Sequence, residues 1–252
     1  WLLLGIGNLL GIWWAYVELA FGGYWVWDPV ENSSLMPWLV ATAFLHSVMM
    51  QRRRGMLKVW NMVLVILTFI LPLLGTLLTR SSGLSPLHGF TESPKLALQG
   101  IMFLIFIGVA LLGSLGLLYY RSEDLKSEAE MESLVSRESI FLLVNLLLVV
   151  STFAIFFGTV FPKLSEGLLG VKMGVGPPFF NQVNTPIFLA LVLLAGICTL
   201  IGWRRASVNN LLRNFLGPLV IAFIIGIALL LFGMREWAAI IAFIVSSFVL
   251  LT

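Results

Sequence analysis

The chain has 252 residues, of which 60% are hydrophobic and only 11% are charged. An average soluble domain has about 25% charged residues, so this composition excludes an ordinary soluble protein and indicates an integral membrane protein. The net charge of +3 is small, and the basic residues lie between apolar stretches, so they report membrane orientation rather than nucleic-acid binding.

A helix that crosses a bilayer needs about 20 apolar residues. The sequence therefore predicts an all-α fold, a polytopic bundle of about eight transmembrane helices forming one domain over 1–252. The expected spans are 1–20, 36–51, 60–79, 97–119, 139–160, 185–203, 215–233 and 237–252. Because the second span is short, we expect 29–35 to form a short amphipathic helix in the membrane interface.

Both ends of the chain are apolar, and it opens on Trp1 without a methionine or a basic segment. We interpret the chain as an internal part of a longer polytopic protein. The single cysteine, Cys198, lies in an apolar segment and excludes an intrachain disulfide.

A polar and aromatic stretch, FGGYWVWDPVENSSL over 21–35, separates the first two spans. Gly22 and Gly23 allow a flat ligand to approach the backbone, because no Cβ stands in the way. Trp and Tyr also gather at membrane interfaces, so an interfacial aromatic belt is the alternative. The glycine pair and the order of aromatic, acidic and proline residues favour a ligand site.

The same stretch contains the signals of a helix start. We expect Asp28 to be the N-cap, Pro29 the first helical residue, and Glu31 the second half of a capping box. The backbone N–H groups of such a helix start can accept an anionic group of a ligand.

Orientation follows from the basic residues of alternate loops. The loops 51–59, 120–138 and 203–214 carry ten Lys and Arg, and the opposite side carries five. The excess places the first set in the cytoplasm, so the aromatic stretch and the loops 80–96 and 161–184 face outward. The charged segment 121–138 is expected to be a solvated helix. In the loop 161–184, residues 179–181 either wall a cavity or anchor the loop.

The chain has two histidines. His88 lies in the outer loop 80–96, where a solvated side chain and a haem-iron ligand are both open interpretations. His46 lies about 15 Å along the helix from Met36, inside a span, and an ionisable group at that depth is a functional hypothesis by default. Trp38 and Thr42 share its helix face. The alternative for His46 is a neutral histidine bonded between helices.

These residues resemble the tryptophan-rich signature of the haem-handling WWD-domain membrane proteins. Within them, the Asp28-Pro29-Val30-Glu31-Asn32 continuation is similar to the CcmF-type subunits of cytochrome c haem lyase. Further agreement comes from Met36-Pro37-Trp38, Leu45-His46-Ser47, Leu74-Gly75-Thr76, Thr79-Arg80-Ser81, His88, Gly158-Thr159, Pro162 and Gly176 to Asn181. One departure is Phe21, where the family usually has Trp.

The resemblance implies two sites for haem. His46 would ligate the iron of a resident b-type haem, and His88 the iron of the substrate haem on the outer face. Arg80 would pair with a propionate, with a bilayer-edge anchor as its alternative. The remaining expected contacts to haem are Phe21, Gly22, Gly23, Tyr24, Trp25, Trp27, Asp28, Glu31, Asn32 and Trp38.

The implied function is ligation of haem to the CxxCH thiols of apocytochrome c in the bacterial inner membrane. A CcmE-type haem chaperone, CcmH, CcmI, apocytochrome c, membrane lipid and quinol are the implied partners. A haem exporter of the CcmC type and a polytopic transporter without haem are the two alternatives.

Overall fold

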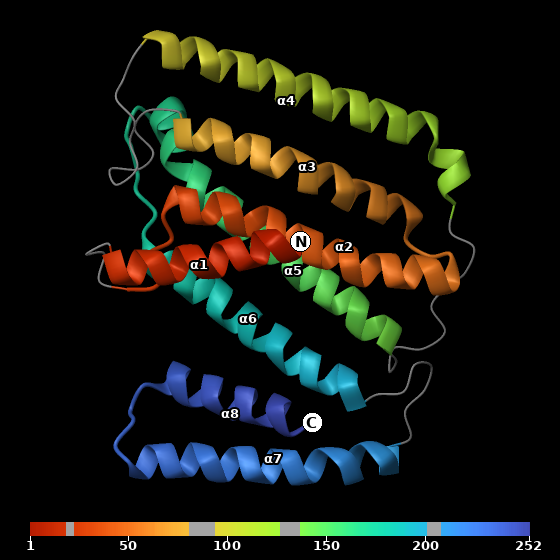
Figure 1. Ribbon diagram of the computed structural model, residues 1–252, viewed down its shortest axis with the longest axis vertical. Coiled ribbons are helices and arrows are strands. Elements are labelled where there is room, and N and C mark those ends of the chain that lie inside the picture. Colours follow the sequence, from red (N-terminus) through yellow and green to blue (C-terminus); the bar gives the residue numbers. More distant parts are fainter. Residues whose placement is uncertain (19–22, 81–93, 127–136, 201–207) are drawn as a thin grey trace. The chain divides into compact units, whose positions relative to one another are not determined.

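The fold is entirely helical in the part of the chain that the computed structural model describes, residues 1–18, 23–80, 94–126, 137–200 and 208–252. This agrees with the all-α prediction. The α-helices, labelled in Figure 1, are α1 (Leu2–Glu18), α2 (Pro29–Arg54), α3 (Lys58–Arg80), α4 (Pro94–Tyr120), α5 (Arg137–Leu169), α6 (Pro177–Leu200), α7 (Val208–Leu231) and α8 (Trp237–Leu251). A short 3-10 helix, η1 (Ser122–Leu125), follows α4.

Five of these helices, α2 to α6, are long and apolar enough to cross a membrane. The other three, α1, α7 and α8, are apolar but shorter in their described parts. A chain with this many apolar helices is a membrane protein.

The prediction of a separate amphipathic helix before the second span is wrong. Residues 29–35 are the first two turns of one continuous helix from Pro29 to Arg54, rather than a separate amphipathic helix. The polar residues of these turns are inside the protein: Asn32 is 0% exposed and Ser33 is 8% exposed. Because their partners are protein groups, this segment has no need to lie along the membrane surface.

The connection after α5 is also shorter than predicted. Residues 161–184 were expected to form a loop, but α5 continues through Pro162 to Leu169 and α6 begins at Pro177. An internal proline is tolerated in membrane helices because neighbouring groups satisfy the freed carbonyl. Pro177 is at a helix start, where its missing N–H costs nothing. The non-helical connection therefore covers only about seven residues, 170–176.

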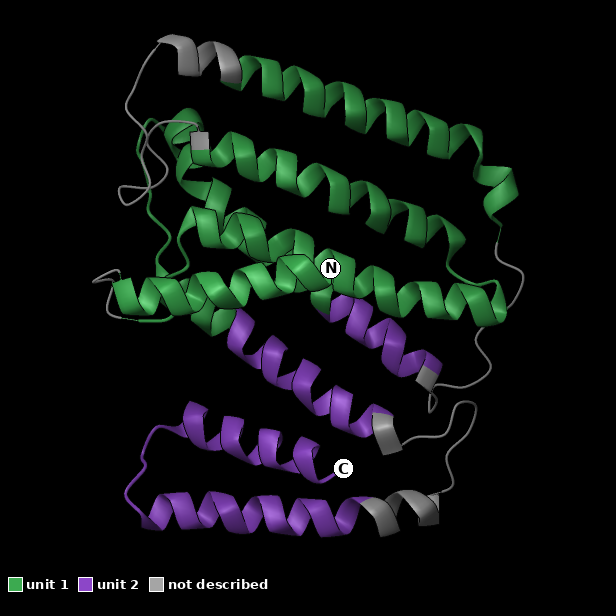
Figure 2. Cartoon of the chain, in the orientation of Figure 1, with its two compact units in different colours: residues 1–129, 148–183 green, residues 130–147, 184–252 purple. Residues whose placement is uncertain are grey.

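The helices divide into two compact units, coloured separately in Figure 2. Unit 1 comprises 1–129 and 148–183, and unit 2 comprises 130–147 and 184–252. Each unit takes part of α5 and part of α6. In unit 2, α7 packs on α8, with the rings of Phe215 and Phe248 5.8 Å apart.

The α2–α3 pair is the main packing contact of unit 1. Met36, Val40 and Leu64 are fully buried there. The two helices approach closely at Gly75 of α3, where an added Cβ would lie 2.8 Å from the Cβ of Ser33. This contact fixes the N-terminal half of α2, which carries the predicted site residues Glu31, Asn32 and Trp38.

Candidate functional site

The turn that opens α2 is held by two carboxylates. Asp28 is the N-cap, and its Oδ2 accepts a hydrogen bond from the backbone N–H of Val30 at 2.9 Å. Glu31 Oε2 accepts from the backbone N–H groups of Asp28 at 3.1 Å and Val26 at 3.0 Å. The predicted capping box is therefore confirmed. Both carboxylates act on the backbone, so their direct role is to shape the segment that carries the tryptophans.

Trp27 is the most constrained residue of this segment. Its φ of 58° is in the left-handed region, which a bulky residue adopts only when its surroundings impose it. The surroundings are on α6: the indole stacks on Phe180 at 5.2 Å and 11°, and its Nε1 donates to Asn181 Oδ1 at 2.7 Å. One face and the N–H of Trp27 are thus committed to the protein.

Asn32 and α5 also hold the Trp27 segment in place, and we call all the contacts that fix Trp27 the clamp. Asn32 is fully buried, and its Nδ2 donates to the Trp27 carbonyl and to Thr159 Oγ1, each at 3.0 Å. At Gly158, an added Cβ would lie 2.7 Å from Phe180, so α5 and α6 meet this closely only because glycine stands there. The sequence left two roles open for residues 179–181, a cavity wall and a loop anchor, and pointed to Gly158 and Thr159 by resemblance alone. In the structure, Phe180 and Asn181 contact Trp27 directly, and Thr159 bonds to Asn32.

Trp25 differs from Trp27 because its N–H is not used by the described residues. The two indoles meet edge to face, with centroids 5.9 Å apart at 87°. Trp25 Nε1 is buried and has no hydrogen-bond partner within the described part of the chain. A buried donor without an acceptor is costly unless a ligand or water supplies one.

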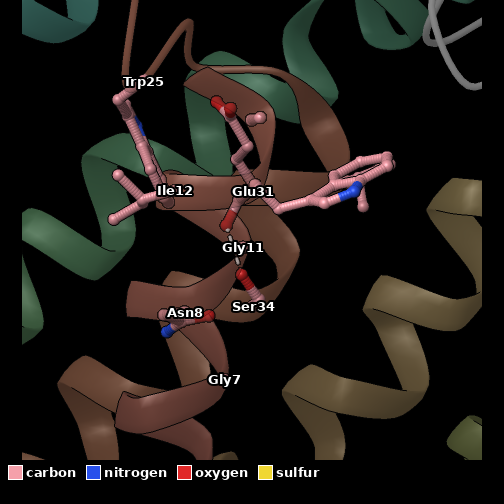
Figure 3. A pocket seen from close by; sticks show the side chains of 10 residues that line it. Gly7, Asn8, Gly11, Ile12, Trp25, Glu31 and Ser34 are labelled. Atoms are coloured by element: carbon pink, nitrogen blue, oxygen red, sulfur yellow. Dashed lines mark hydrogen bonds between the residues drawn. The ribbon is translucent and has the colours of Figure 1, made fainter. Parts of the chain in front are cut away.

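Trp25 also lines two cavities between α1 and the start of α2. One, of ≈ 370 Å³, is bounded by Gly7, Asn8, Gly11, Ile12, Trp14, Ala15, Val30, Glu31 and Ser34 besides Trp25, and Figure 3 shows their side chains. The other, of ≈ 350 Å³, is almost entirely apolar and includes Gly5 and Trp38. Cavities of this size with few polar groups are typical of small-molecule sites. The sequence did not predict that α1 would form their wall.

Tyr24 directly precedes Trp25 in the chain but is more exposed, at 56%. Its ring stacks on Tyr16 of α1 at 4.1 Å and 9°. A hydrogen bond with the Tyr16 hydroxyl raises the pKa of Tyr24 above its ordinary value. Tyr24 therefore carries a neutral hydroxyl at physiological pH and contributes an aromatic face rather than a charge.

His46 lies on one face of α2 with Trp38 and Thr42, as predicted, and we call these three residues the stripe. Its Nδ1 is 2.8 Å from the Thr42 carbonyl oxygen. A carbonyl oxygen only accepts, so Nδ1 is the donor in this contact. Trp1 extends the stripe: it stacks on Trp38 at 5.9 Å and donates from Nε1 to Thr42 Oγ1 at 2.8 Å.

Some predicted residues cannot be placed at the site. Phe21, Gly22 and His88 lie outside the described residues. Arg80 is the last residue of α3, and only its backbone is described. At Gly23, an added Cβ would meet no heavy atom within 4 Å, so the described part of the protein itself does not require glycine there.

The fold and this site define a class: polytopic membrane proteins that carry a clamped, tryptophan-rich segment beside apolar cavities. Residues 1–86 match the family described as "Cytochrome C assembly protein". The whole chain is 42% identical to "Cytochrome c-type biogenesis protein CcmF" of Pseudomonas aeruginosa, covering 38% of that protein. It is 41% identical over 88% of its length to "Cytochrome c-type biogenesis protein ccl1" of Rhodobacter capsulatus, covering 33% of it.

A comparison with solved structures agrees with these sequence similarities. The chain superimposes on "Cytochrome c Heme Lyase CcmF" with a TM-score of 0.69 at 34% identity, over 96% of this chain and 35% of that one. The resemblance found in the sequence is thereby confirmed, and the chain is a homologue of CcmF-type cytochrome c biogenesis proteins. It spans little more than a third of the length of these relatives.

Proposed function

We propose that the chain is part of the membrane subunit of a cytochrome c haem lyase, which attaches haem to the CxxCH thiols of apocytochrome c. The observation that carries this proposal is the contrast between Trp27 and Trp25. Trp27 is committed to α6, whereas Trp25 has a buried N–H without a partner among the described residues and borders two cavities. Relatives along the full chain are named for the same process.

The substrate haem would lie against the outer aromatic segment. A porphyrin is flat and apolar across its face, so Trp25, Tyr24 and Phe21 suit it as contact surfaces. The His88 imidazole would ligate its iron from the outer loop. Arg80, at the end of α3, would offer a charge partner for a propionate.

The reaction requires little acid–base catalysis from the protein. Each thioether forms when a cysteine S–H adds across a vinyl C=C of haem: the sulfur bonds to one carbon, the hydrogen goes to the other, and nothing leaves. The expected contribution of the protein is to hold vinyl groups and thiols in register, which raises their effective concentration. Asp28, Glu31 and Asn32 would serve this purpose by fixing the turn of the aromatic segment.

His46 fits the requirements of a ligand for a resident b-type haem. Metal-binding histidines commonly donate their second ring N–H to a carbonyl, and His46 does so with Thr42. Nε2 is then the ligand atom, and the stacked Trp38 and Trp1 would offer aromatic contacts nearby. Such a haem would supply electrons that keep the substrate iron reduced, and quinol is its proposed electron donor.

Orientation and partners complete the proposal. The aromatic segment would face the periplasm of a bacterial inner membrane, because the opposite side has more Lys and Arg. A CcmE-type chaperone would deliver haem, and CcmH and CcmI would present the apocytochrome. A CcmC-type exporter would form stable haem–chaperone complexes without a thioether product, and a transporter unrelated to haem would purify without it.

Replacing His88 with glycine in the full-length protein tests the ligand assignment. We expect cytochrome maturation to stop and the outer haem to decrease, while the b-type spectrum remains. Added imidazole should restore part of the activity, because it can enter the space left by the side chain and coordinate iron. The absorption spectrum with and without imidazole is the measurement. Loss of the b-type haem with retention of the outer haem would mean that the two histidines are assigned the wrong way round.

A further inference from the structure

Two tyrosines form a stacked pair at the C-terminal end of α1. Tyr16 of α1 and Tyr24 of the aromatic segment have their ring centroids 4.1 Å apart, with an interplanar angle of 9°. A hydrogen bond joins their hydroxyls. Both side chains are exposed, at 53% and 56%, so a ligand can reach them. The pair therefore presents two hydroxyls side by side, and Tyr24 directly precedes Trp25.

One O–H group of this pair remains available to a ligand. Each hydroxyl has a single hydrogen, and one tyrosine uses its hydrogen on the oxygen of the other. No residue in the described part of the chain accepts the second hydrogen. The hydroxyl that accepts within the pair is the stronger donor, because linked hydrogen bonds polarise each other. The pair is therefore a neutral donor that suits an anionic oxygen.

An anionic ligand group at the aromatic segment needs such a donor, because this part of the chain has no basic residue. Residues 1–51 contain no Lys or Arg. The start of α2, which the sequence offered as an anion site, is occupied by carboxylates of the protein itself. Asp28 Oδ2 accepts from the Val30 N–H at 2.9 Å. Glu31 Oε2 accepts from the N–H groups of Val26 and Asp28, so a second anion there would be repelled.

We propose that the Tyr16–Tyr24 pair binds one propionate of the substrate haem, an inference that rests on the proposed function. The available O–H would donate to a propionate oxygen, and hydrogen bonds to a carboxylate are stronger than neutral ones. Glu18, the acidic residue of α1, follows Tyr16 by two residues, which places it about 200° around the helix. The vinyl groups lie at the porphyrin edge opposite the propionates. This contact would therefore direct the vinyl edge away from α1, toward the incoming thiols.

Haem and haem dimethyl ester, titrated separately into the full-length protein, test this inference. The ester has the same porphyrin but no propionate charge. We expect Tyr16→Phe/Tyr24→Phe, which keeps both rings, to weaken haem binding about tenfold, the size of one hydrogen bond to a charged group. Its affinity for the dimethyl ester should equal that of wild type. The matched control, Tyr119→Phe/Tyr120→Phe, removes two exposed hydroxyls at the end of α4 and should bind both ligands like wild type.

Three results would overturn the inference while leaving the proposed function intact. The Tyr16/Tyr24 variant could bind haem as tightly as wild type, or it could lose haem and the dimethyl ester equally, which would mean that the hydroxyls only support the fold of the segment. The control pair could also lose as much haem affinity as the Tyr16/Tyr24 pair. A wild-type protein that binds neither ligand saturably would instead overturn the proposed function, and this inference with it.

Discussion

Replacing Trp25 and Trp27 together with alanine should abolish the haem that copurifies on the outer face. Trp25→Ala removes the aromatic surface that borders both cavities, and Trp27→Ala releases the segment from Phe180 and Asn181. Central aromatic contacts commonly cost about 2 kcal/mol or more when truncated, which is about 30-fold in affinity. Haem bound per protein, measured by pyridine haemochrome, is the readout.

The single variants separate the two roles. Trp25→Phe keeps a ring but removes the buried N–H, so it should retain part of the outer haem. Trp27→Ala should also lower protein stability, because Asn181 and Phe180 lose their partner. Trp237→Ala in α8 removes an exposed indole, 70% accessible, and serves as the control. Unchanged haem content in the double variant at normal expression would leave only the aromatic-belt interpretation.

His46→Ala should remove the b-type absorbance from the assembled protein while leaving it inserted in the membrane. The expected loss is nearly complete, because alanine offers no ligand atom to iron. The outer haem should remain, since His88 lies in a different segment. Reduced-minus-oxidised difference spectra at equal protein concentration give the answer.

Thr42→Val is the matched control for His46. It removes the hydroxyl that bonds to Trp1 but keeps the backbone carbonyl that orients His46. The b-type absorbance should therefore persist in this variant. Full retention of the b-type haem in His46→Ala would return His46 to a structural role between helices.

The sequence predicted the local features of this site and missed the distant ones. The capping box of Asp28 and Glu31 was predictable because its partners lie within five residues and the pattern has one geometric solution. The stripe of Trp38, Thr42 and His46 followed from helix periodicity. Both features depend only on neighbours along the chain.

The clamp on Trp27 was not predictable in the same way. Asn181 is 154 residues away, and no pattern within either segment states that they meet. The continuation of α5 through Pro162 was missed because a proline and nearby polar residues normally indicate a helix end. In this protein, packing at Gly158 on Phe180 accompanies the longer helix. Tertiary contacts thus determined where α5 ends, because the local sequence signals were ambiguous.

We propose that the full-length protein attaches haem covalently to cytochrome c. The most direct measurement is the mass of a CxxCH cytochrome from a strain that lacks its own CcmF-type protein and expresses the full-length form of this one. If this proposal is correct, the cytochrome carries one haem per CxxCH motif, with both cysteines blocked from alkylation, and no haem when the Trp25→Ala/Trp27→Ala variant is expressed. A cytochrome with free thiols, in cells where the protein is inserted and its haem chaperone is loaded, would contradict it.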